Sequence, residues 1–375
     1  MAKNPLQSIT LVAGARPNFM KIAPLVHALK AHNARARLPI EYRLVHTGQH
    51  YDHCMSRSFF DELGIPEPDY NLGVQGGSHA GQTAGILVAF ERLLWEHPTR
   101  LVVVVGDVNS TLACAITAKK LDTGVAHVEA GLRSFDMRMP EEINRIVTDR
   151  LSDLLFTTDP AAEENLRREG VPSERIHPVG NVMIDTLLRE RERARGVARF
   201  QAVKAGGPYA LLTLHRPSNV DDAPTFRRLA AVLAKLAAEI PILFPCHPRT
   251  RERMAAFGIA FPGAVTLLEP LSYLEMLNLL LDARLVLTDS GGLQEETTAL
   301  GIPCITLREN TERPVTVTHG TNTVAGTDAA RIRAAFRAAL EGKIRTGRVP
   351  PLWDGHAAER IVAVLSAWLE KAPVP

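Results

Sequence analysis

Residues 101–105 read Leu-Val-Val-Val-Val and are followed directly by Gly106 and Asp107. Every position of this run is apolar, whereas a strand with one face in water alternates apolar and polar residues. A run of this kind is typical of a central strand in a parallel sheet, because helices cover both of its faces. The stretch predicts an α/β fold and places Asp107 just beyond the carboxyl end of a buried strand.

On both sides of this run, short β-branched segments alternate with longer segments of helical composition. Such alternation predicts βαβ units and a parallel sheet. In a first series we expect strands at residues 9–13, 101–105, 125–129 and 154–157. In a second series we expect them at 210–214, 242–244, 265–268, 285–288 and 304–307, with an amphipathic helix at 226–238. Two such series within 375 residues predict two Rossmann-like domains.

A charged segment with few apolar residues, 189–199, separates the two series. We expect the domain boundary and a hinge just upstream of it, near Gly180. The first domain then spans residues 1–180, and the second begins at residue 181. A last helix is expected at 357–369.

The composition is that of a soluble globular protein. Hydrophobic residues make up 46% and charged residues 22%, and no run of about eighteen apolar residues could span a bilayer. The 43 basic and 41 acidic residues are spread along the chain, without the basic blocks of a nucleic-acid binder. The four cysteines lie far apart, at Cys54, Cys114, Cys246 and Cys304, and the N-terminus lacks the build of a signal peptide. We therefore expect a cytoplasmic protein that binds neither nucleic acid nor membrane.

The first expected strand leads into a turn that has the composition of an anion site. Between Gly14 and Lys21, the glycine permits a tight turn, Pro17 suits the start of a helix, and Arg16 and Lys21 supply positive charge. The pattern is not the Gly-x-Gly-x-x-Gly of nicotinamide dinucleotide sites. On these residues alone, an anion site and ordinary surface cations are equally open.

A second candidate anion site lies at residues 289–296, Asp-Ser-Gly-Gly-Leu-Gln-Glu-Glu. Here a strand passes directly into a helix, so backbone amides near Ser290, Gly291 and Gly292 can face an anion that the helix dipole attracts. A diphosphate would fit there. Glu296, about one turn into the helix, could accept hydrogen bonds from both hydroxyls of a ribose. A capping role for Ser290 would leave the two glycines and the acidic turn unexplained.

Acidic residues follow expected strands of the first series at three places: Asp107, Glu129, and Glu141 beside Glu142. The carboxyl ends of parallel strands meet at one edge of a sheet, so these carboxylates are expected to gather there and repel one another. Repulsion raises the proton affinity of some of them and provides acids and bases that work near neutral pH. Each one singly could instead cap a helix or form a salt bridge, but the set favours proton transfer.

Two histidine motifs follow expected strands of the second series, His215-Arg216 and His247-Pro248-Arg249. Histidine and arginine at such an edge suit phosphate binding or proton transfer, although a single histidine is more often structural. The sequence has no His-Glu-x-x-His motif and no cysteine pair. We therefore expect neither a metal nor a cofactor.

The motifs form a string from residue 9 to about residue 326. They read GARPNFMKIAPL, TGQHYD, GDVNSTLA, HVEAGLRS, PEEINR, LHRPSNVD, PCHPRT, LTDSGGLQEE and TERPVTV, and HVEAGLR and DSGGLQEE are highly specific. The string resembles the non-hydrolysing UDP-N-acetylglucosamine 2-epimerases. The resemblance implies two domains arranged as in GT-B glycosyltransferases, with the active site in the cleft between them. It also implies that the final helix, within 356–375, packs on the first domain, which leaves 181–355 to the second.

The activity implied by the resemblance is inversion at C2 of UDP-N-acetylglucosamine, giving UDP-N-acetylmannosamine through elimination of UDP to 2-acetamidoglucal and its re-addition. By position, Asp107, Glu129 and Glu141 match acid/base residues of the family, and His215 matches a catalytic histidine. The positions linked to UDP or its diphosphate are Arg16, Lys21, Ser290, Gly291, Glu296 and Arg313. Gly292, His247 and Arg249 join them as candidates from the residues alone. A homodimer and a cell-surface polysaccharide pathway are the usual context.

Some bacterial members are activated by a second UDP-N-acetylglucosamine through a Gln-His pair, which Gln49 and His50 match. This chain departs from common forms of the motifs at Asn18, where glutamate is common, and in His215-Arg216-Pro217-Ser218-Asn219, where HRREN is common. A UDP-linked 2,3-diacetamido uronic acid is therefore an alternative substrate. Further alternatives are a GT-B glycosyltransferase, a hydrolysing 2-epimerase and a silent nucleotide-sugar sensor. The acid cluster argues against the transferase, which needs one base, and against the sensor.

Overall fold

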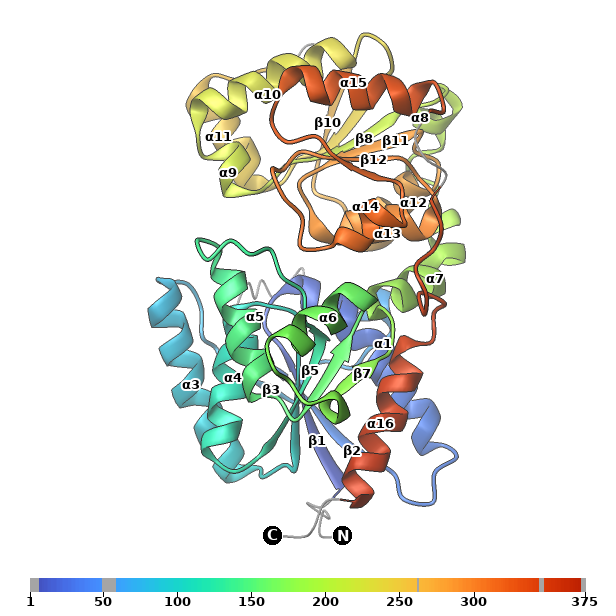
Figure 1. Cartoon of the computed structure of the whole chain (residues 1–375). Coiled ribbons are helices and arrows are strands. Elements are labelled where there is room, and N and C mark those ends of the chain that lie inside the picture. Colours follow the sequence, from blue (N-terminus) through green and yellow to red (C-terminus); the bar gives the residue numbers. More distant parts are fainter. Residues whose placement is uncertain (1–6, 49–58, 262, 344–346, 372–375) are drawn as a thin grey trace. The chain divides into compact units, whose positions relative to one another are not determined.

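The structure is a computed structural model that describes residues 7–48, 59–261, 263–343 and 347–371 (Figure 1). It divides into two compact units: unit 1 comprises Met1–Thr186 and Pro351–Pro375, and unit 2 comprises Leu187–Pro350. The division falls inside helix α7 (Val182–Arg195), after the position near residue 180 that the sequence suggested. The charged segment belongs to this helix as far as Arg195, and its arginines and glutamates pair along the helix at a spacing of three residues.

The described part of unit 1 is built around a parallel sheet with the strand order β3-β2-β1-β4-β5-β6-β7. Its strands are β1 (Ser8–Ala13), β2 (Glu41–His46), β3 (Tyr70–Asn71), β4 (Leu101–Val105), β5 (Gly124–Ala130), β6 (Leu154–Thr157) and β7 (Ile176–Pro178). Strand β4 is fully buried, as its apolar sequence predicts. The strand order reverses between β1 and β4, and this switch point is where open α/β sheets bind ligands.

Helices cover both faces of this sheet (Figure 1). They are α1 (Arg16–Asn33), α3 (His79–Glu96), α4 (Asn109–Lys120), α5 (Pro140–Leu151), α6 (Pro160–Arg168) and α16 (Ala357–Lys371). Helices α3 and α4 pack their apolar side chains on Val12, Val102 and Val104. On the other side, α16 packs against α1 (Figure 1). Unit 1 is therefore a three-layer structure that the last helix of the chain completes.

Hydrogen bonds hold the C-terminal segment onto unit 1. The Asp185 carboxylate accepts bonds from the amides of Ala357 (3.1 Å) and Ala358 (2.7 Å) at the start of α16. The Trp353 indole donates to the Thr158 carbonyl over 2.9 Å. Burial raises the pKa of Asp185, although the two amide bonds lower it. These contacts tie α16 to the beginning of α7.

Gly180 lies where this segment comes closest to the chain before α7. Its φ is +87°, and a Cβ at this position would overlap the Leu352 carbonyl oxygen. We expect Gly180→Ala to lower the free energy of unfolding by about 3 kcal/mol, because backbone strain adds to the clash. Gly170→Ala is the matched control, since Gly170 also has a positive φ, 76°, but open space around it, and should cost about 1 kcal/mol. If urea unfolding gave both variants the same loss of stability, the clash with the Leu352 carbonyl would be contradicted.

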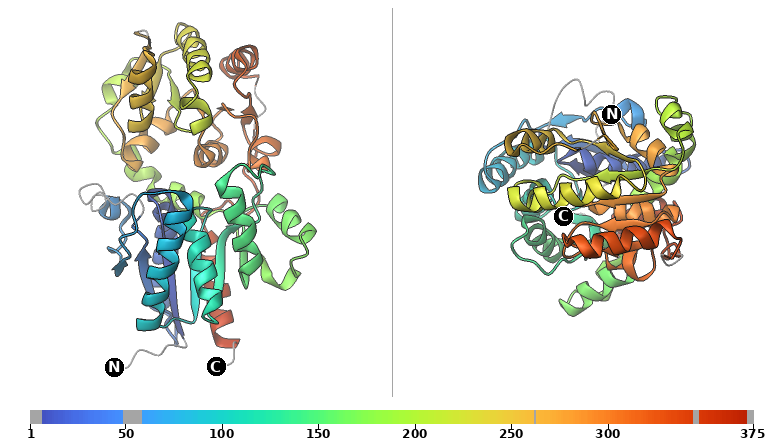
Figure 2. Two further views of the ribbon diagram at one scale, coloured as in Figure 1. Left: turned by 90° about the vertical axis from the view of Figure 1, so that its left-hand side faces the viewer. Right: turned by 90° about the horizontal axis from the view of Figure 1, so that it is seen from above.

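Unit 2 has a second parallel sheet, with the strand order β10-β9-β8-β11-β12-β13 in its described part. Its strands are β8 (Ala210–Thr213), β9 (Ile242–Pro245), β10 (Val265–Leu268), β11 (Leu285–Thr288), β12 (Cys304–Thr306) and β13 (Asn322–Val324). Its helices are α8 (Gln201–Ala205), α9 (Pro217–Val220), α10 (Ala223–Leu236), α11 (Pro248–Phe257), α12 (Tyr273–Leu281), α13 (Gly291–Leu300), α14 (Pro314–Thr318) and α15 (Ala329–Leu340). Helices α10 and α15 lie side by side over the sheet (Figure 2), and Phe226 and Phe336 bury between them and it.

These two sheets with their interleaved helices confirm the predicted α/β class and the two Rossmann-like domains. The order in unit 2 also reverses, between β8 and β11, so its switch point lies beside the loops that follow these two strands. No helix within the described ranges is long and apolar enough to cross a membrane.

Candidate functional site

Asn18 shapes the turn after β1 at the switch point of unit 1. Its side-chain oxygen accepts hydrogen bonds from the amides of Gly14 (3.1 Å) and Ala15 (2.8 Å). Its side-chain nitrogen donates to the Val105 carbonyl at the end of β4, over 3.1 Å. A Cβ on Gly14 would overlap the Ser110 hydroxyl, so the turn requires glycine. Asn18 thus ties together the two loops that border the switch point.

Glu129, at the end of β5, is held in an unusual conformation. Its φ is +73°, and the register of β5 against β6 shifts around it. Such a backbone is unfavourable for a residue with a side chain, and residues held in it cluster at functional sites. Its buried carboxylate forms an ion pair with Lys21 from α1. Lys21 also approaches Gly106, where an added Cβ would lie 2.8 Å from its Nζ atom.

Asp107 follows Gly106 and is bound by a buried arginine. The guanidinium of Arg145 donates to Oδ2 of Asp107 from Nε (3.0 Å) and from a terminal nitrogen (2.6 Å). The side chain of Asn144 donates to the Asp107 carbonyl over 2.8 Å. Asp107 follows Gly106, and Oε2 of Glu129 would lie 3.9 Å from a Cβ added to this glycine, so both acids lie near Gly106, each beside its own cation. The sequence argument assumed that the carboxylates repel one another, whereas the structure places Arg145 and Lys21 next to them.

A buried network of charged side chains and histidine holds the turn at Gly106. The two ring nitrogens of His127 contact the Asp149 carboxylate (2.6 Å) and the Gly106 carbonyl (2.8 Å). Asp149 also binds Arg133 over 2.7 Å. Burial raises the pKa of Asp149, but His127 and Arg133 outweigh burial and bring this pKa below its ordinary value. The network connects β5 to α5 and to the turn before Asp107.

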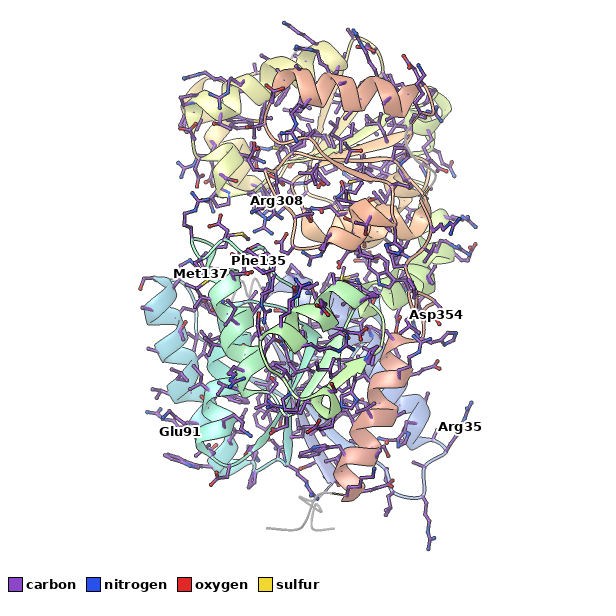
Figure 3. The ribbon with its side chains drawn as sticks, in the orientation of Figure 1. Arg35, Glu91, Phe135, Met137, Arg308 and Asp354 are labelled. Atoms are coloured by element: carbon purple, nitrogen blue, oxygen red, sulfur yellow. The ribbon has the colours of Figure 1, made fainter. Side chains whose placement is uncertain are left out.

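Glu141 and Glu142, at the start of α5, have different surroundings. Glu142 is buried and accepts hydrogen bonds from the amides of Ser134 and Phe135 (both 2.9 Å), from the Ser134 hydroxyl (3.0 Å) and from Arg145 (2.8 Å). It therefore fixes the loop that presents Phe135, which is 78% exposed (Figure 3). Glu141 is half-buried. Of the two acids, Glu142 is the structural one.

This contrast gives a stability prediction. We expect Glu142→Gln to lower the free energy of unfolding by about 2 kcal/mol, because an amide offers one acceptor where the carboxylate offers two. Glu141→Gln is the matched control, and because Glu141 is only half-buried this substitution should lower the free energy of unfolding by about 1 kcal/mol at most. Urea unfolding followed by circular dichroism measures both. A loss at Glu141 as large as that at Glu142 would refute the assignment.

In unit 2, the start of α13 has the groups of an anion site. Ser290 is its N-cap residue, yet within the described residues the Ser290 side chain makes no capping hydrogen bond. The guanidinium of Arg313 packs on Gly291, where an added Cβ would lie 2.5 Å from a terminal nitrogen. Arg313 is buried and pairs with Glu295 over 2.9 Å. Backbone amides at Gly291 and Gly292 and a fixed guanidinium together suit a phosphate group.

A buried hydrogen-bond network holds Arg313 at this helix start. Gln294 donates to the Ser290 carbonyl (3.2 Å) and accepts from the Thr311 hydroxyl (2.6 Å). That same Thr311 hydroxyl accepts from the Arg313 amide over 3.1 Å. The network therefore connects α13 to the segment that carries Arg313, and its members could not be recognised from their spacing alone.

Two further arginines gather near Arg313, and the sequence analysis did not single them out as a group. Arg308 contacts buried Glu312 over 2.8 Å and carries a buried side chain itself (Figure 3). Arg216 and Arg313 each lie 3.8 Å from Glu312. With Glu295, the partner of Arg313, three guanidiniums face two carboxylates, and the one positive charge in excess favours an anionic ligand.

Glu296 lies buried one turn into α13. The Tyr273 hydroxyl, from the start of α12, donates to its Oε1 atom over 3.0 Å. Burial raises the pKa of Glu296, the Tyr273 bond lowers it and the charge of Glu295 raises it, which brings the pKa to about 7. A carboxylate of this kind is ionised or neutral depending on what binds beside it.

His215 is positioned by Asp289, a fully buried residue at the end of β11. The Asp289 carboxylate accepts bonds from the amides of His215 (3.0 Å) and Arg216 (2.9 Å) and from the Asn219 side chain (3.1 Å). Its Oδ1 atom also lies 3.1 Å from Nδ1 of His215. Burial raises the pKa of Asp289, but these partners outweigh burial and lower it. Asp289 is thus the anchor of the His215 loop, a role that its motif did not reveal.

His247 and Arg249 are less firmly placed for ligand binding. The ring of His247 lies 6.3 Å from that of His215, and its Nδ1 atom accepts the Arg249 amide over 3.3 Å as a helix cap. The Arg249 side chain is paired with Asp221. The structure therefore brings His247 near His215 and gives Arg249 a carboxylate partner.

Some predicted residues lie outside the described part of the chain. Gln49 and His50 fall in residues 49–58, and of Arg16 only the backbone, at the start of α1, is described. Within the described residues, no group of three or more His, Cys, Asp or Glu side chains could hold a metal ion.

Known proteins share the sequence and the fold. The profile of a family described as UDP-N-acetylglucosamine 2-epimerase matches residues 32–366. The UDP-N-acetylglucosamine 2-epimerase of Methanocaldococcus jannaschii is 40% identical over an alignment of 368 residues that covers 96% of this chain and 98% of that protein. The UDP-2,3-diacetamido-2,3-dideoxy-D-glucuronate 2-epimerase of Pseudomonas aeruginosa is 39% identical over 361 residues, 96% of this chain and 99% of that protein. The crystal structure of the M. jannaschii enzyme with UDP-GlcNAc and UDP superposes with a TM-score of 0.89 at 38% identity, covering 96% of this chain and 99% of that one.

Proposed function

Because the chain belongs to the UDP-N-acetylglucosamine 2-epimerase family, we propose that it interconverts UDP-N-acetylglucosamine and UDP-N-acetylmannosamine by inversion at C2. A base removes the C2 proton while the C1–O bond breaks and UDP leaves with the electron pair, which gives 2-acetamidoglucal. UDP then adds back to C1, and a proton reaches C2 from the opposite face. The observation that carries this proposal is the strained, buried Glu129 at the end of β5, whose partner Lys21 also lies beside Gly106, the residue before Asp107.

We assign proton transfer to unit 1. Asp107, Glu129 and Glu141 are the proposed acid and base groups, and the Lys21 ammonium holds the Glu129 carboxylate in place. A carboxylate must approach C2 along one direction, so a fixed side chain shortens the search for the reactive geometry. Proton delivery from the opposite face requires a second group, and Asp107 and Glu141 are its candidates.

We assign the departing UDP to unit 2. The first amides of α13, Ser290 and Arg313 would bind the diphosphate, and their positive field would stabilise the charge that grows on the leaving oxygen. Glu296 would accept hydrogen bonds from the ribose hydroxyls. His215 would lie beside the phosphates and act as the catalytic histidine. Arg16 belongs to the same proposal by its place at the start of α1. Gln49 and His50 remain candidates for an activating second nucleotide sugar.

Proton NMR of the protein with UDP-N-acetylglucosamine in deuterated water, without added metal or dinucleotide, tests the reaction. UDP-N-acetylmannosamine that carries deuterium at C2 is the expected product. Free UDP with free N-acetylmannosamine would instead identify a hydrolysing 2-epimerase. Transfer of the sugar to an added acceptor, with the C2 proton retained, would identify a glycosyltransferase.

A second candidate substrate is UDP-2,3-diacetamido-2,3-dideoxy-glucuronate. It is favoured by the similarity to the P. aeruginosa enzyme that is named for this sugar, at 39% identity. The same elimination at C1 and C2 would apply, because both sugars carry an acetamido group at C2. Comparison of kcat/KM for the two UDP-sugars separates the candidates, and a preference of tenfold or more would identify the substrate.

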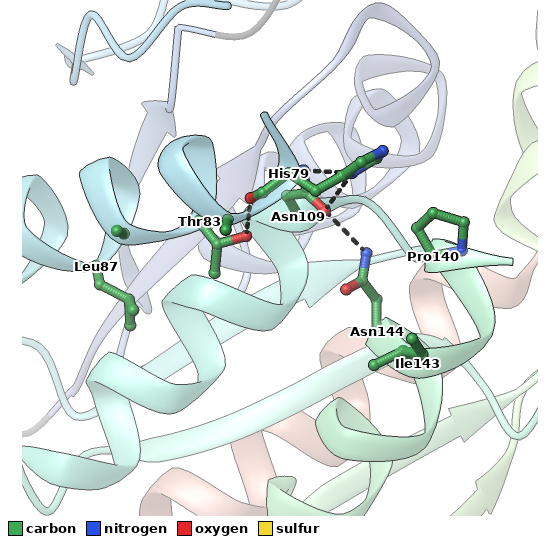
Figure 4. Close-up of a pocket in the computed structure, with 9 residues that line it drawn as sticks. His79, Thr83, Leu87, Asn109, Pro140, Ile143 and Asn144 are labelled. Atoms are coloured by element: carbon green, nitrogen blue, oxygen red, sulfur yellow. Dashed lines mark hydrogen bonds between the residues drawn. The ribbon is translucent and has the colours of Figure 1, made fainter. Parts of the chain in front are cut away.

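We also propose a homodimer through helix α3. Val88 (52% exposed) and Trp95 (64%) form an apolar stripe on α3, and Ile143 of α5 (43%) lies beside it. Ile143 and, on α3, Leu87 line an open pocket of about 330 Å³ (Figure 4). Glu91 and Arg92 in the stripe offer both charges, so a two-fold related copy is complementary to it. Sedimentation equilibrium should give a dimer, and a monomeric wild-type protein would contradict the proposal.

The free cysteines and the product bear on where the enzyme works in the cell. Cys114, Cys246 and Cys304 are free and buried, which is usual for thiols in the reducing cytoplasm. We therefore place the enzyme there. An acetamido sugar activated with UDP is a donor for glycan synthesis, so we place the product in a cell-surface polysaccharide pathway.

A further inference from the structure

Tyr273 has a contact that neither its helix nor its core packing requires. It is the first residue of α12, and its hydroxyl bonds to Oε1 of Glu296 on the neighbouring helix α13. The start of α12 is fixed independently, because the Ser272 hydroxyl accepts from the Glu275 amide (3.3 Å) and Glu275 accepts from the Ser272 amide (2.9 Å). The capping box therefore satisfies the helix end, and the Tyr273 hydroxyl is available to orient Glu296.

Glu296 is the carboxylate that a nucleoside diphosphate would meet. Four residues after Gly292, it lies about 6 Å further along the helix axis than the amides that suit a phosphate. Within the described residues, its Oε2 atom has no hydrogen bond, whereas Oε1 accepts from Tyr273. The bond at Oε1 restrains the rotation of the buried carboxylate and leaves acceptor positions for two hydroxyls.

We propose that Tyr273 is a positioning residue for Glu296, and that its hydroxyl sets the preference of this site for a ribonucleotide over a 2′-deoxyribonucleotide. The inference rests on the proposed function, because it takes the diphosphate at α13 as its starting point. Without the hydroxyl, the carboxylate can rotate, and the bond to the 2′-hydroxyl loses its fixed acceptor. The phosphate contacts are unaffected, so binding of the deoxy compound should change little.

The pH dependence gives this role its own signature. Ribose hydroxyls donate to the ionised carboxylate, so the preference for UDP should be full above the pKa of Glu296, about 7, and should fall as the pH drops below it. The Tyr273 bond lowers this pKa. Its removal should therefore move the midpoint of the preference to higher pH. The ratio of the two dissociation constants cancels the titration of the phosphates, which both ligands share.

Isothermal titration of UDP and 2′-deoxy-UDP between pH 5.5 and 9 is the test. For the wild-type protein at pH 8 we expect UDP to bind about tenfold tighter than 2′-deoxy-UDP, as for a hydrogen bond to a charged group. In Tyr273→Phe the ratio at the same pH should fall below about threefold and recover in part toward pH 9. Phenylalanine keeps the aromatic ring that packs at the start of α12, so we expect the change in the ratio of the two dissociation constants.

Tyr209→Phe is the matched control. Its buried hydroxyl bonds to the Leu279 carbonyl over 2.6 Å, near the other end of α12, so the variant also removes a tyrosine hydroxyl that contacts this helix. It should reduce stability and leave the ratio and its pH midpoint unchanged. An unchanged ratio in Tyr273→Phe, or an equal loss in Tyr209→Phe, would overturn the positioning role while turnover of the UDP-sugar stands. A wild-type protein that binds neither ligand would overturn the proposed function and this inference together.

Discussion

Glu129→Gln is expected to reduce kcat for UDP-N-acetylglucosamine by about 100-fold or more and to leave the Kd for UDP within about threefold. An amide is nearly isosteric with the carboxylate but cannot take up the C2 proton. Glu129 lies in unit 1 with Lys21 as its partner, whereas the proposed diphosphate contacts at α13 belong to unit 2. The substitution should therefore lower turnover without weakening UDP binding. Deuterium exchange at C2, followed by NMR, should fall in parallel with turnover.

Asp153→Asn is the matched control for this variant. Asp153 accepts from the Lys119 ammonium over 3.1 Å and from the Val125 amide over 2.8 Å, at the amino end of β5. Asp153, just before β6, therefore makes the same kind of acid–lysine pair and contacts β5 at the end opposite Glu129. The control should keep its turnover within about twofold of the wild type. Full turnover in Glu129→Gln would remove this residue from the chemistry and leave Asp107 and Glu141 as the candidates.

The main strands could be predicted from sequence because their burial leaves a continuous apolar signal. The run at 101–105 is β4 without change, and β11 agrees with its predicted range. Four strands were not predicted: β2 mixes charged and apolar residues, and β3, β7 and β13 have only two or three residues each. Such short segments become strands through the neighbours with which they pair, so their own composition carries little signal.

The candidate site could be predicted as a set of positions but not as a set of contacts. Parallel strands end at one edge, so Asp107 and Glu129 could be placed there from the sequence. The partner of each depends on helix packing, which brings Lys21 and Arg145 across from distant segments. The positive φ of Glu129 could not be predicted either, because glycine is the main sequence signal for this backbone conformation.

The distinction between Glu141 and Glu142 shows the same limit. Both acids stand at the start of a helix behind a proline, a context in which either one could cap or catalyse. Only the three-dimensional structure shows that Glu142 turns inward to Ser134 and Arg145. Tyr273 lies in a segment without any motif, and its importance depends on the approach of α12 to α13.

Gly291→Ala is expected to weaken UDP binding by about 100-fold while the protein remains folded. The added methyl group would lie 2.5 Å from a terminal nitrogen and 2.9 Å from Cζ of Arg313. The Arg313 backbone cannot yield easily, since its amide bonds to Thr311 (3.1 Å) and its carbonyl accepts from Thr316 (2.8 Å). The guanidinium must therefore leave the start of α13, and a charge-assisted contact to the diphosphate is lost with it.

Gly263→Ala serves as the control, because Gly263 lies in the same unit with a φ outside the left-handed region and no atom within 4 Å of an added Cβ. Titration calorimetry with UDP should give this control the affinity of the wild type. Alanine is favourable at a helix start, so Gly291→Ala should not unfold α13 for lack of propensity. If the variant nevertheless fails to fold, Arg313→Lys removes the planar guanidinium without adding an atom, and it should weaken UDP binding in the same way. Wild-type affinity in both variants would show that the diphosphate is bound elsewhere than at this helix start.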